Sequence, residues 1–305
     1  MVLTDRPALK SSSVLVRLAA TGICGTDLGL ASGKLGACRD ILGHEGVGYV
    51  EQIGSAVDPS LVKLGDRVGI TWLRDVCGVC PYCLHPGGHV RCQEQLNSGR
   101  KIDGTFAEYA EVPSSYLVAL PASITLPDEQ IAPILCGGVT AYSALKNCGG
   151  TLGQWVVISG AGGGVGALAV QFAKAMGYRV VAIDIGDAKR QLCLSSGADS
   201  YVDARAVDDF AGEIRKSTGP HGASVVLNCA GSGHAYNVLL DLVAPFGNFV
   251  CVGIPPPDEL VSFHPLLLID RGIKLTGSVI GSRQEILEAL EFVQSGRVKP
   301  AIIVD

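Results

Sequence analysis

Three separate short segments each carry a residue of the kind that binds a catalytic zinc ion. Cys24 lies in TGICGTD, His44 in GHEG and Cys136 in PILCGG. Two cysteines and one histidine leave one position of a tetrahedral zinc open, as a metal that polarises a substrate requires. Taken singly, each residue is more simply explained as a buried thiol or a core histidine. Their joint occurrence in glycine-flanked segments predicts a catalytic zinc site.

Polar residues beside these ligands suggest how the site is completed. Asp27 follows Cys24 by three residues, and we expect it to hydrogen-bond the unligated nitrogen of His44 and so fix its tautomer. Glu45 is a candidate supporting group or transient metal ligand. Thr26 is a candidate partner of the substrate oxygen and the start of a proton path. The simpler alternatives are that Thr26 and Asp27 cap a turn and that Glu45 is a surface carboxylate.

Four further cysteines fall within sixteen residues, in the order Cys77-x2-Cys80-x2-Cys83-x8-Cys92. This spacing predicts an all-thiolate structural zinc site, which has no open position and holds a loop together without doing chemistry. His85 and His89 lie inside the same loop and are alternative ligands. We favour Cys92 because it completes an all-cysteine set.

A glycine-rich run predicts a dinucleotide-binding turn. The apolar segment 155–159 is followed by Gly160-Ala161-Gly162-Gly163-Gly164-Val165-Gly166 and then by apolar residues at helical spacing. Glycines let backbone amides approach a pyrophosphate, and a helix N-terminus offers unpaired N–H groups. The G-x-G-x-x-G match is imperfect, since Ala161 occupies its first position, so the strand–turn–helix context carries the prediction. A glycine-rich turn without a ligand is the alternative.

An acid ends the next predicted strand, 179–184. Asp184 lies eighteen residues after Gly166, where a carboxylate accepts hydrogen bonds from ribose hydroxyls and repels a 2′-phosphate. The sequence therefore predicts NAD rather than NADP. Lys189 is expected to add a contact to the same ribose, with a solvated surface lysine as the alternative.

The elements that must position these residues change in kind along the chain. Residues up to about 135 contain short Val- and Ile-rich segments separated by Gly and Pro turns, whereas strands and helices alternate from about Trp155 onward. Such alternation predicts an α/β fold whose doubly wound parallel sheet has helices on both faces. Ser282 and Glu285 form a predicted capping box that opens a last helix.

Composition argues against several classes of protein. The 305 residues suffice for two domains. The chain is 48% hydrophobic and 17% charged, with a mean hydropathy of +0.35. It has no run of ~18 uninterrupted apolar residues, so we assign the surplus to buried strands instead of a membrane span.

Charge and cysteine use point to a cytoplasmic protein without nucleic-acid partners. The net charge of -5 and the lack of a Lys/Arg cluster argue against nucleic-acid binding. The N-terminus, MVLTDRPALKSSS, lacks the apolar core of a signal peptide. Seven of the eleven cysteines belong to the predicted zinc sites, which indicates a reducing compartment.

With these residues in place, the chain resembles the zinc-dependent alcohol dehydrogenases of the medium-chain dehydrogenase/reductase superfamily, and among them the fungal-type tetrameric branch. The matching segments include CGTDL, GHEGVGYVEQIG, the CxxCxxC loop, DGTFAEYA and APILCGGVTAYSALK. The resemblance implies a GroES-like catalytic domain over 1–134, a Rossmann domain over 135–281 and a return to the catalytic domain over 282–305. It also implies two zinc ions per chain, a homo-oligomer, and reversible NAD-dependent oxidation of a small primary or secondary alcohol.

The resemblance also assigns roles by position. Cys24, His44 and Cys136 match the catalytic zinc ligands, and Glu45 matches an alternate ligand. Trp72 matches a wall of the substrate pocket. The implied coenzyme contacts are Gly163, Gly164, Val165, Asp184, Lys189, Val252, Ile254, Ser278 and Ile280.

Two of the departures of the sequence from the family pattern bear most directly on activity. It is shorter at both ends, and the relay histidine expected soon after Thr26 is replaced, with Ser32 near its position. The shortened ends motivate a second hypothesis, a non-catalytic zinc- and NAD-binding paralogue. A zinc-free quinone-reductase relative is a third possibility, which Cys24, His44 and Cys136 argue against.

Overall fold

The computed structural model describes residues 3–304, which form two compact units. The first unit runs to Val139 and takes up Gly281–Gln294 and the residues from Pro300 onward. The second unit comprises Thr140–Ile280 and Ser295–Lys299. Cys136 therefore belongs to the same unit as Cys24 and His44, a few residues before the chain crosses into the second unit.

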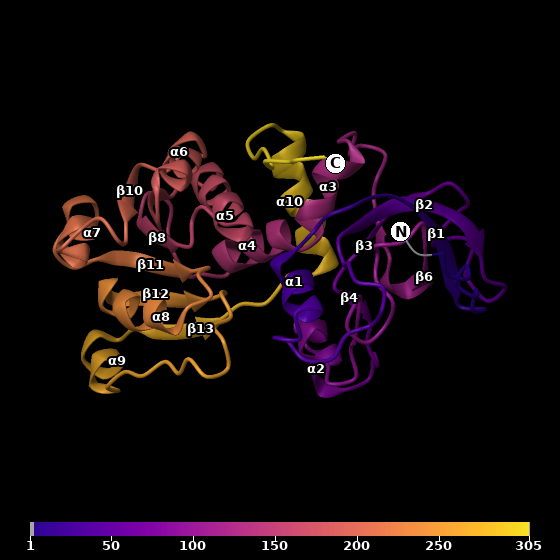
Figure 1. The fold of residues 1–305 in the computed structure, drawn as a ribbon, viewed down its shortest axis with the longest axis horizontal. Coiled ribbons are helices and arrows are strands. Elements are labelled where there is room, and N and C mark those ends of the chain that lie inside the picture. Colours follow the sequence, from indigo (N-terminus) through magenta and orange to yellow (C-terminus); the bar gives the residue numbers. More distant parts are fainter. Residues whose placement is uncertain (1–2, 305) are drawn as a thin grey trace. The chain divides into compact units, whose positions relative to one another are not determined.

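The first unit is built on a five-stranded antiparallel sheet with the order β6-β1-β2-β3-β7 (Figure 1). Val14, Val16, Val50, Val68 and Val112 project from these strands into one buried apolar cluster. The strands are β1 (Ser13–Thr21), β2 (Gly46–Ile53), β3 (Arg67–Ile70), β6 (Tyr109–Pro113) and β7 (Val118–Ala119). The burial patterns of β1 and β2 begin with four and three consecutive buried residues, so both faces of the sheet are covered there.

A second, two-stranded sheet supports the cysteine-rich loop. It pairs β4 (Leu73–Asp75) with β5 (Leu96–Asn97), and the chain between them forms α2 (Pro81–Leu84) and the 3-10 turn η1 (Gly88–Arg91). Arg74, only 1% exposed, donates from Nε to Ser98 Oγ at 3.1 Å and from Nη2 to the Asp103 carbonyl at 3.0 Å. A buried guanidinium is tolerated because its N–H groups find acceptors.

The helices of the first unit are short except for the last. Besides α2 and η1, they are α1 (Gly25–Ala31), η2 (Ser114–Tyr116), α3 (Asp128–Ile131), η3 (Ala132–Leu135) and α10 (Arg283–Gln294). The predicted capping box opens α10: the Ser282 N–H bonds Glu285 Oε2 at 2.8 Å, and the Glu285 N–H bonds Ser282 Oγ at 3.2 Å. The Arg283 guanidinium lies 5.0 Å above the ring of Tyr116, which attaches α10 to this unit.

The second unit is a six-stranded parallel sheet with the order β10-β9-β8-β11-β12-β13. Its strands are β8 (Trp155–Ser159), β9 (Arg179–Asp184), β10 (Ser200–Asp203), β11 (Ala223–Asn228), β12 (Val243–Cys251) and β13 (Lys274–Gly277). Numbered within the unit, this is the doubly wound order 3-2-1-4-5-6 of dinucleotide-binding folds. The predicted α/β fold class is confirmed.

Helices pack against this sheet, with α5 and α6 on strands β8 to β10 and α8 and α9 on strands β11 and β12 (Figure 1). The elements are α4 (Gly137–Lys146), which crosses from the first unit, α5 (Gly164–Ala175), α6 (Asp187–Ser195), α7 (Phe210–Thr218), α8 (Gly233–Leu239), η4 (Leu240–Leu242) and α9 (Leu266–Arg271). Val157, Val181, Val226 and Phe249 are completely buried between the layers. Strands covered on both faces account for the apolar composition. Over residues 3–304, no helix combines the length and hydropathy that crossing a bilayer requires.

Candidate active site and dinucleotide site

Helix α1 begins at the first predicted zinc ligand. Cys24 is its N-cap residue in an extended conformation, and its Sγ accepts the N–H of Thr26 at 3.5 Å. Asp27 closes a capping box because its Oδ2 accepts the N–H of Cys24 at 2.9 Å. The sequence CGTD therefore starts a helix. It also brings the thiol of Cys24 and the carboxylate of Asp27 together at the N-terminus of that helix.

Asp27 also holds His44. Its Oδ1 lies 3.0 Å from His44 Nδ1 and accepts the N–H of Gly43 at 3.0 Å, and both side chains are almost fully buried. Burial alone would raise the pKa of Asp27, but the hydrogen bonds from His44, Cys24 and Gly43 hold it below its usual value. An ionised Asp27 can only accept, so Nδ1 of a neutral His44 carries the proton and Nε2 keeps its lone pair.

The structure brings four potential ligands together from three places in the chain. Ligand atoms of Cys24, His44, Glu45 and Cys136 all lie within 4.8 Å of one another. Cys136 follows η3, and His44 and Glu45 directly precede β2. The Sγ atoms of Cys24 and Cys136 are 3.9 Å apart. Two sulfurs at about 2.3 Å from a tetrahedral zinc would be about 3.8 Å apart, so the donor set fits zinc.

Hydrogen bonds within this donor set shift the pKa values of its members. The hydrogen bond with Cys136 is the main reason that the pKa of Cys24 falls to about 4, and that bond together with burial raises the pKa of Cys136. Burial lowers the pKa of His44, but hydrogen bonds with Asp27 and Cys24 outweigh it and raise the value to about 10. Ligands that crowd in this way release protons when a metal binds.

Glu45 is 5% exposed, so it is not a surface carboxylate. Burial is the main cause that raises its pKa to about 8. Space for it depends on Gly22, where a Cβ atom would lie 2.0 Å from Glu45 Oε2. The role of Gly22 was missed in the sequence, although a glycine two residues before the Cys24 ligand was a signal that something approaches the backbone there.

Three other predicted residues lie around the donor set. The ring of Trp72 packs edge-on against His44, with ring centroids 5.3 Å apart. Thr26 is half-buried in the first turn of α1. Ser32 is the exposed C-cap of the same helix, and its hydroxyl donates to the Gly29 carbonyl at 3.2 Å. Thr26 and Ser32 thus occupy opposite ends of α1.

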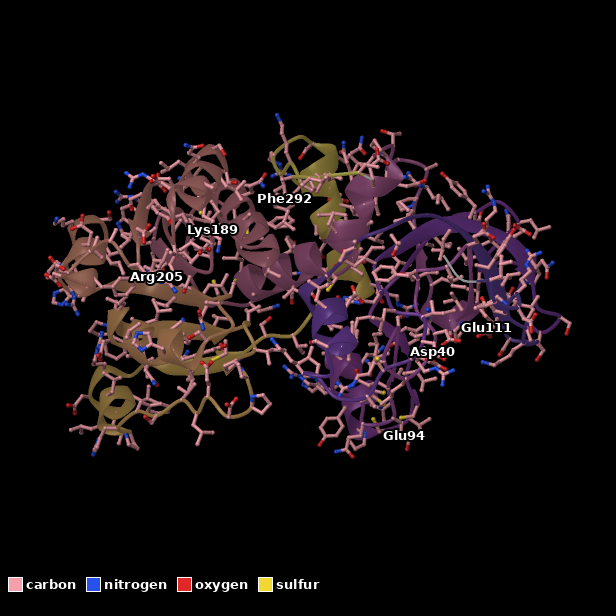
Figure 2. All side chains as sticks on the ribbon, viewed as in Figure 1. Asp40, Glu94, Glu111, Lys189, Arg205 and Phe292 are labelled. Carbon is pink, nitrogen blue, oxygen red and sulfur yellow. The ribbon has the colours of Figure 1, made fainter. Side chains whose placement is uncertain are left out.

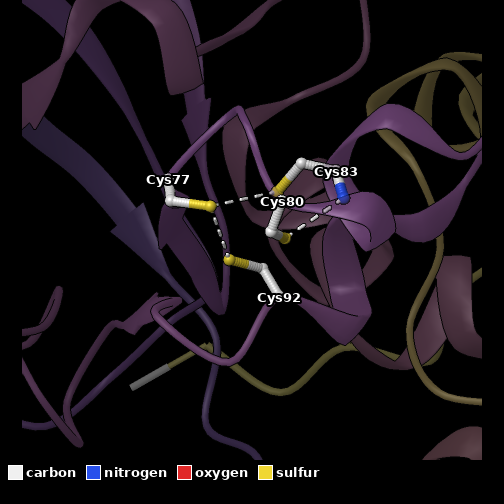
Figure 3. Close-up of side chains that lie close together, drawn as sticks. All are labelled: Cys77, Cys80, Cys83 and Cys92. Atoms are coloured by element: carbon white, nitrogen blue, oxygen red, sulfur yellow. Dashed lines mark hydrogen bonds between the residues drawn. The ribbon is translucent and has the colours of Figure 1, made fainter.

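The four cysteines of the loop form the second group (Figure 3). Their sulfur atoms lie within 4.8 Å of one another, and Cys77 Sγ is 3.9 Å from Cys83 Sγ and 3.6 Å from Cys92 Sγ. These separations match two thiolates on one tetrahedral zinc and exceed the ~2.05 Å of a disulfide. The histidines of the loop bond elsewhere: His85 Nδ1 to the Pro86 carbonyl at 2.8 Å, and His89 Nδ1 to Tyr116 Oη at 2.9 Å.

The glycine run forms the turn between β8 and α5. Gly160 has φ of +69°, and Gly163 is the N-cap of α5 without a side-chain cap, so the first N–H groups of the helix stay available. A Cβ on Gly166 would lie 2.0 Å from the Gly160 carbonyl oxygen, whereas one on Gly164 meets nothing within 4 Å. Close helix–strand packing therefore requires Gly166, and the open side at Gly164 suits an approaching ligand.

Asp184 ends β9 beside this turn. Its Oδ2 accepts the N–H of Gly162 at 2.8 Å, and its Oδ1 accepts from the Ile185 N–H at 2.8 Å and Lys189 Nζ at 2.7 Å. It is 8% exposed. The predicted pair of Asp184 and Lys189 therefore forms an ion pair at the carboxyl end of the sheet, where ligands of such folds bind.

The four remaining predicted coenzyme residues follow the last two strands of the sheet. Val252 and Ile254 come directly after β12, and Ser278 and Ile280 come directly after β13. The N–H of Ser278 bonds the Cys251 carbonyl at 2.9 Å, which continues the pairing of the two strands. Ile254 is 73% exposed, and Ile280 adopts a positive φ of 35°.

Comparisons with known proteins agree with this organisation. Residues 10–122 match the family profile described as an alcohol dehydrogenase GroES-like domain, and residues 164–295 match one described as a zinc-binding dehydrogenase. An alcohol dehydrogenase of Geobacillus stearothermophilus is 41% identical over 303 residues, 98% of this chain and 87% of the relative. Alcohol dehydrogenase 2 of Emericella nidulans is 38% identical over 97% of this chain and 84% of the relative.

Solved structures show the same likeness. An alcohol dehydrogenase from a Thermus species superposes with a TM-score of 0.89 at 28% identity, covering 98% of this chain and 86% of that one. A zinc-binding dehydrogenase from Sinorhizobium meliloti, bound to NADP, has a TM-score of 0.85 at 30% identity, covering 97% of this chain and 85% of the other.

Proposed function

This chain belongs to the zinc-dependent alcohol dehydrogenases, and on that premise we propose that it oxidises a small primary or secondary alcohol with NAD, reversibly. In that reaction the substrate carbon gives up a hydride and the hydroxyl gives up a proton, which leaves an aldehyde or a ketone. The observation that carries the proposal is the convergence of Cys24, His44, Glu45 and Cys136 within 4.8 Å, with Asp27 behind the imidazole.

The residues divide the work between a metal centre and a proton path. A zinc ion held by Cys24, His44 and Cys136 would supply a Lewis acid that lowers the pKa of an alcohol hydroxyl, and NAD would supply the hydride acceptor. Two thiolates and a neutral imidazole balance a divalent charge, so the donor set does not repel an anionic substrate oxygen. Asp27 keeps His44 Nδ1 protonated and its Nε2 directed at the centre.

We assign the first proton transfer to Thr26. It sits two residues after Cys24 in the first turn of α1, and its hydroxyl can accept the substrate proton while donating its own onward. Ser32 is exposed at the far end of the helix, so a path through it needs a water in between. Trp72, which packs on His44, forms an apolar wall that favours small substrates. Glu45 is the proposed alternate ligand.

The second unit supplies the coenzyme site. The backbone N–H groups of Gly164 and Val165 at the start of α5 would bind the pyrophosphate, and Gly163, whose own N–H bonds the Gly160 carbonyl at 3.0 Å, would shape the turn around it. Asp184 would accept hydrogen bonds from the ribose hydroxyls. The bound NADP of one structural relative belongs to that protein; the carboxylate at Asp184 supports NAD for this chain. Val252, Ile254, Ser278 and Ile280 complete the nicotinamide half of the site in this proposal.

We further propose a homo-oligomer in the cytoplasm. All four residues of edge strand β13 are exposed. The apolar residues Leu275, on β13, and Ile269, on α9, are 41% and 74% exposed. Apolar surface next to an unpaired strand edge favours association. None of the eleven cysteines forms a disulfide, which suits a reducing compartment.

The test combines metal analysis with turnover. Purified full-length protein should contain about two zinc ions per chain and should form NADH from a panel of short primary and secondary alcohols. Zinc and NADH binding without turnover on any alcohol, aldehyde or ketone would instead support the non-catalytic paralogue.

A further inference from the structure

The turn that follows Asp184 is held by a second carboxylate from the neighbouring strand. Asp203 ends β10 and is the register partner of Asp184 at the end of β9. Its Oδ1 accepts the N–H of Arg205 at 2.9 Å, and its Oδ2 accepts the N–H of Gly186 at 2.7 Å. These two amides lower the pKa of Asp203, so it is ionised at neutral pH.

The same turn is also fixed from its carbonyl side. The hydroxyl of Tyr201, on β10, donates to the Gly186 carbonyl at 3.2 Å, and the Ala204 N–H donates to the Asp184 carbonyl at 3.0 Å. Gly186 has φ of +93°, and a Cβ there would meet nothing within 4 Å. No neighbouring atom packs against the side of Gly186 where a Cβ would point. Its backbone is instead positioned by the hydrogen bonds with β10.

These contacts remove hydrogen-bond donors from the place where a 2′-phosphate would need them. A phosphate is bound by N–H groups and cations. The backbone N–H groups of Gly186 and Arg205 are already used by Asp203, and the side chain of Lys189 is paired with Asp184. Lys189 and Arg205 are labelled in Figure 2.

We infer that Asp203, assisted by Tyr201, is a positioning residue that makes the coenzyme site select against a 2′-phosphorylated ribose. Asp184 offers acceptors to the ribose hydroxyls, while Asp203 withdraws the donors and adds a second fixed negative charge one strand away. The inference rests on the proposed function, since it concerns the same dinucleotide site.

The test measures dissociation constants of NADH and NADPH for the zinc-loaded full chain by nucleotide fluorescence. Asp203→Asn keeps the size and one acceptor oxygen but removes the charge. We expect the ratio of the NADPH to the NADH constant to fall about tenfold, mostly through tighter NADPH binding, because a fixed charge near a phosphate acts over several ångströms. An equal change for both nucleotides would mean that Asp203 is only structural, and would overturn the inference.

Asp199→Asn is the matched control. Asp199 precedes β10, at the other end of that strand, and likewise accepts a backbone N–H, that of Val180 at 2.7 Å. Removing its charge should leave the ratio within about twofold of wild type. A fall equal to that of Asp203→Asn would show that net charge, and not position, sets the ratio, against the inference.

Tyr201→Phe keeps the inference testable if Asp203→Asn does not fold. It removes only the hydroxyl that holds the Gly186 carbonyl, so the ratio should fall about threefold, because one neutral hydrogen bond is lost. No change in the ratio would contradict the role of the turn. Wild type that binds NADH without oxidising alcohols would defeat the proposed function alone, whereas wild type that binds neither nucleotide would defeat both.

Discussion

At the scale of single residues, one buried carboxylate in each unit organises a site by accepting three hydrogen bonds. Asp27 accepts from the N–H groups of Cys24 and Gly43 and from His44. Asp184 accepts from the N–H groups of Gly162 and Ile185 and from Lys189. Carboxylates that accept three hydrogen bonds in this way fix the positions of their neighbours, which is how short motifs acquire defined geometry.

Asp27→Asn should weaken zinc at the catalytic centre and spare the cysteine loop. An amide at this position would place its own N–H group against one of the N–H groups that now donate to Asp27. The two donors would repel each other, so His44 would be positioned less firmly. We expect about 10–100-fold lower affinity at that one site. Chelator competition followed by metal analysis should show one zinc lost early and one retained. Loss of both ions at the same chelator concentration would contradict this assignment.

Asp184→Ala should weaken NADH about 10–100-fold, because hydrogen bonds between a charged group and the ribose hydroxyls are lost. NADPH should weaken far less, since the substitution also releases Lys189 from its ion pair. Fluorescence titration of both nucleotides measures this. Equal weakening of the two would refute the ribose contact.

Asp199 should contribute a pH-dependent part of the stability of the second unit. Burial would raise its pKa, but Lys174 and the N–H of Val180 outweigh burial and lower it. A depressed folded-state pKa stabilises fully above the unfolded value of about 3.9 and is lost as the pH falls through the folded value. We therefore expect Asp199→Asn to cost about 1 kcal/mol at pH 7, reduced by solvent screening of the partly exposed pair.

Urea unfolding of wild type and Asp199→Asn at a series of pH values measures this contribution. The difference in unfolding free energy should be constant at neutral pH and shrink only below about pH 4. A difference that instead grows on acidification would show that the ion pair with Lys174 is not the cause.

At the scale of elements, the strand–turn–helix around the glycines follows from local residues. Segments 155–159 and 179–184, expected as strands, are β8 and β9 with those bounds. Helices α1 and α4 were not predicted. Both lie in glycine-containing segments, and α1 depends on a capping box in which cysteine replaces the usual Ser or Thr, so the ordinary start signal is absent.

Gly166→Ala should separate α5 from β8, because its Cβ would lie 2.0 Å from the Gly160 carbonyl oxygen and 2.7 Å from Ala161 Cα. Such overpacking against backbone costs about 1–3 kcal/mol and should lower the melting temperature of the second unit. Gly164→Ala is the control, since its Cβ meets nothing within 4 Å, and alanine favours the helix. Equal melting temperatures for the two variants would show that α5 can shift away from β8 without a loss of stability.

At the scale of the whole molecule, both metal-binding groups found among residues 3–304 lie in the first unit. The second unit has its own buried core and contains the residues proposed to bind the coenzyme. Zinc binding should therefore stabilise the first unit, and dinucleotide binding should stabilise the second.

Removing zinc with a strong chelator should lower the melting temperature of the first unit, because the crowded thiols and the imidazole lose the cation that their arrangement fits. NADH binding by the second unit should remain. Calorimetry together with fluorescence titration of the stripped protein measures both. Cys92→Ser, which removes one ligand of the loop only, should produce part of the same destabilisation. Loss of NADH binding along with zinc would contradict the independence of the units.

The family, the fold class, the zinc-binding character and the nucleotide cofactor followed from the sequence alone. Each rests on residues close together in the chain, such as Cys77 to Cys92 or the run from Gly160 to Gly166. Local spacing fixes which backbone groups and thiols meet, because a turn or a helix start is decided within a few residues.

Only the tertiary structure decided what surrounds the distant residues. Cys24, His44 and Cys136 were grouped by type, but their approach depends on the sheet that brings α1, the start of β2 and the end of η3 together. The burial of Glu45 against Gly22, and the hold of Asp203 on Gly186, are contacts across the chain with no local signature. Packing determines such contacts, and packing depends on many residues at once.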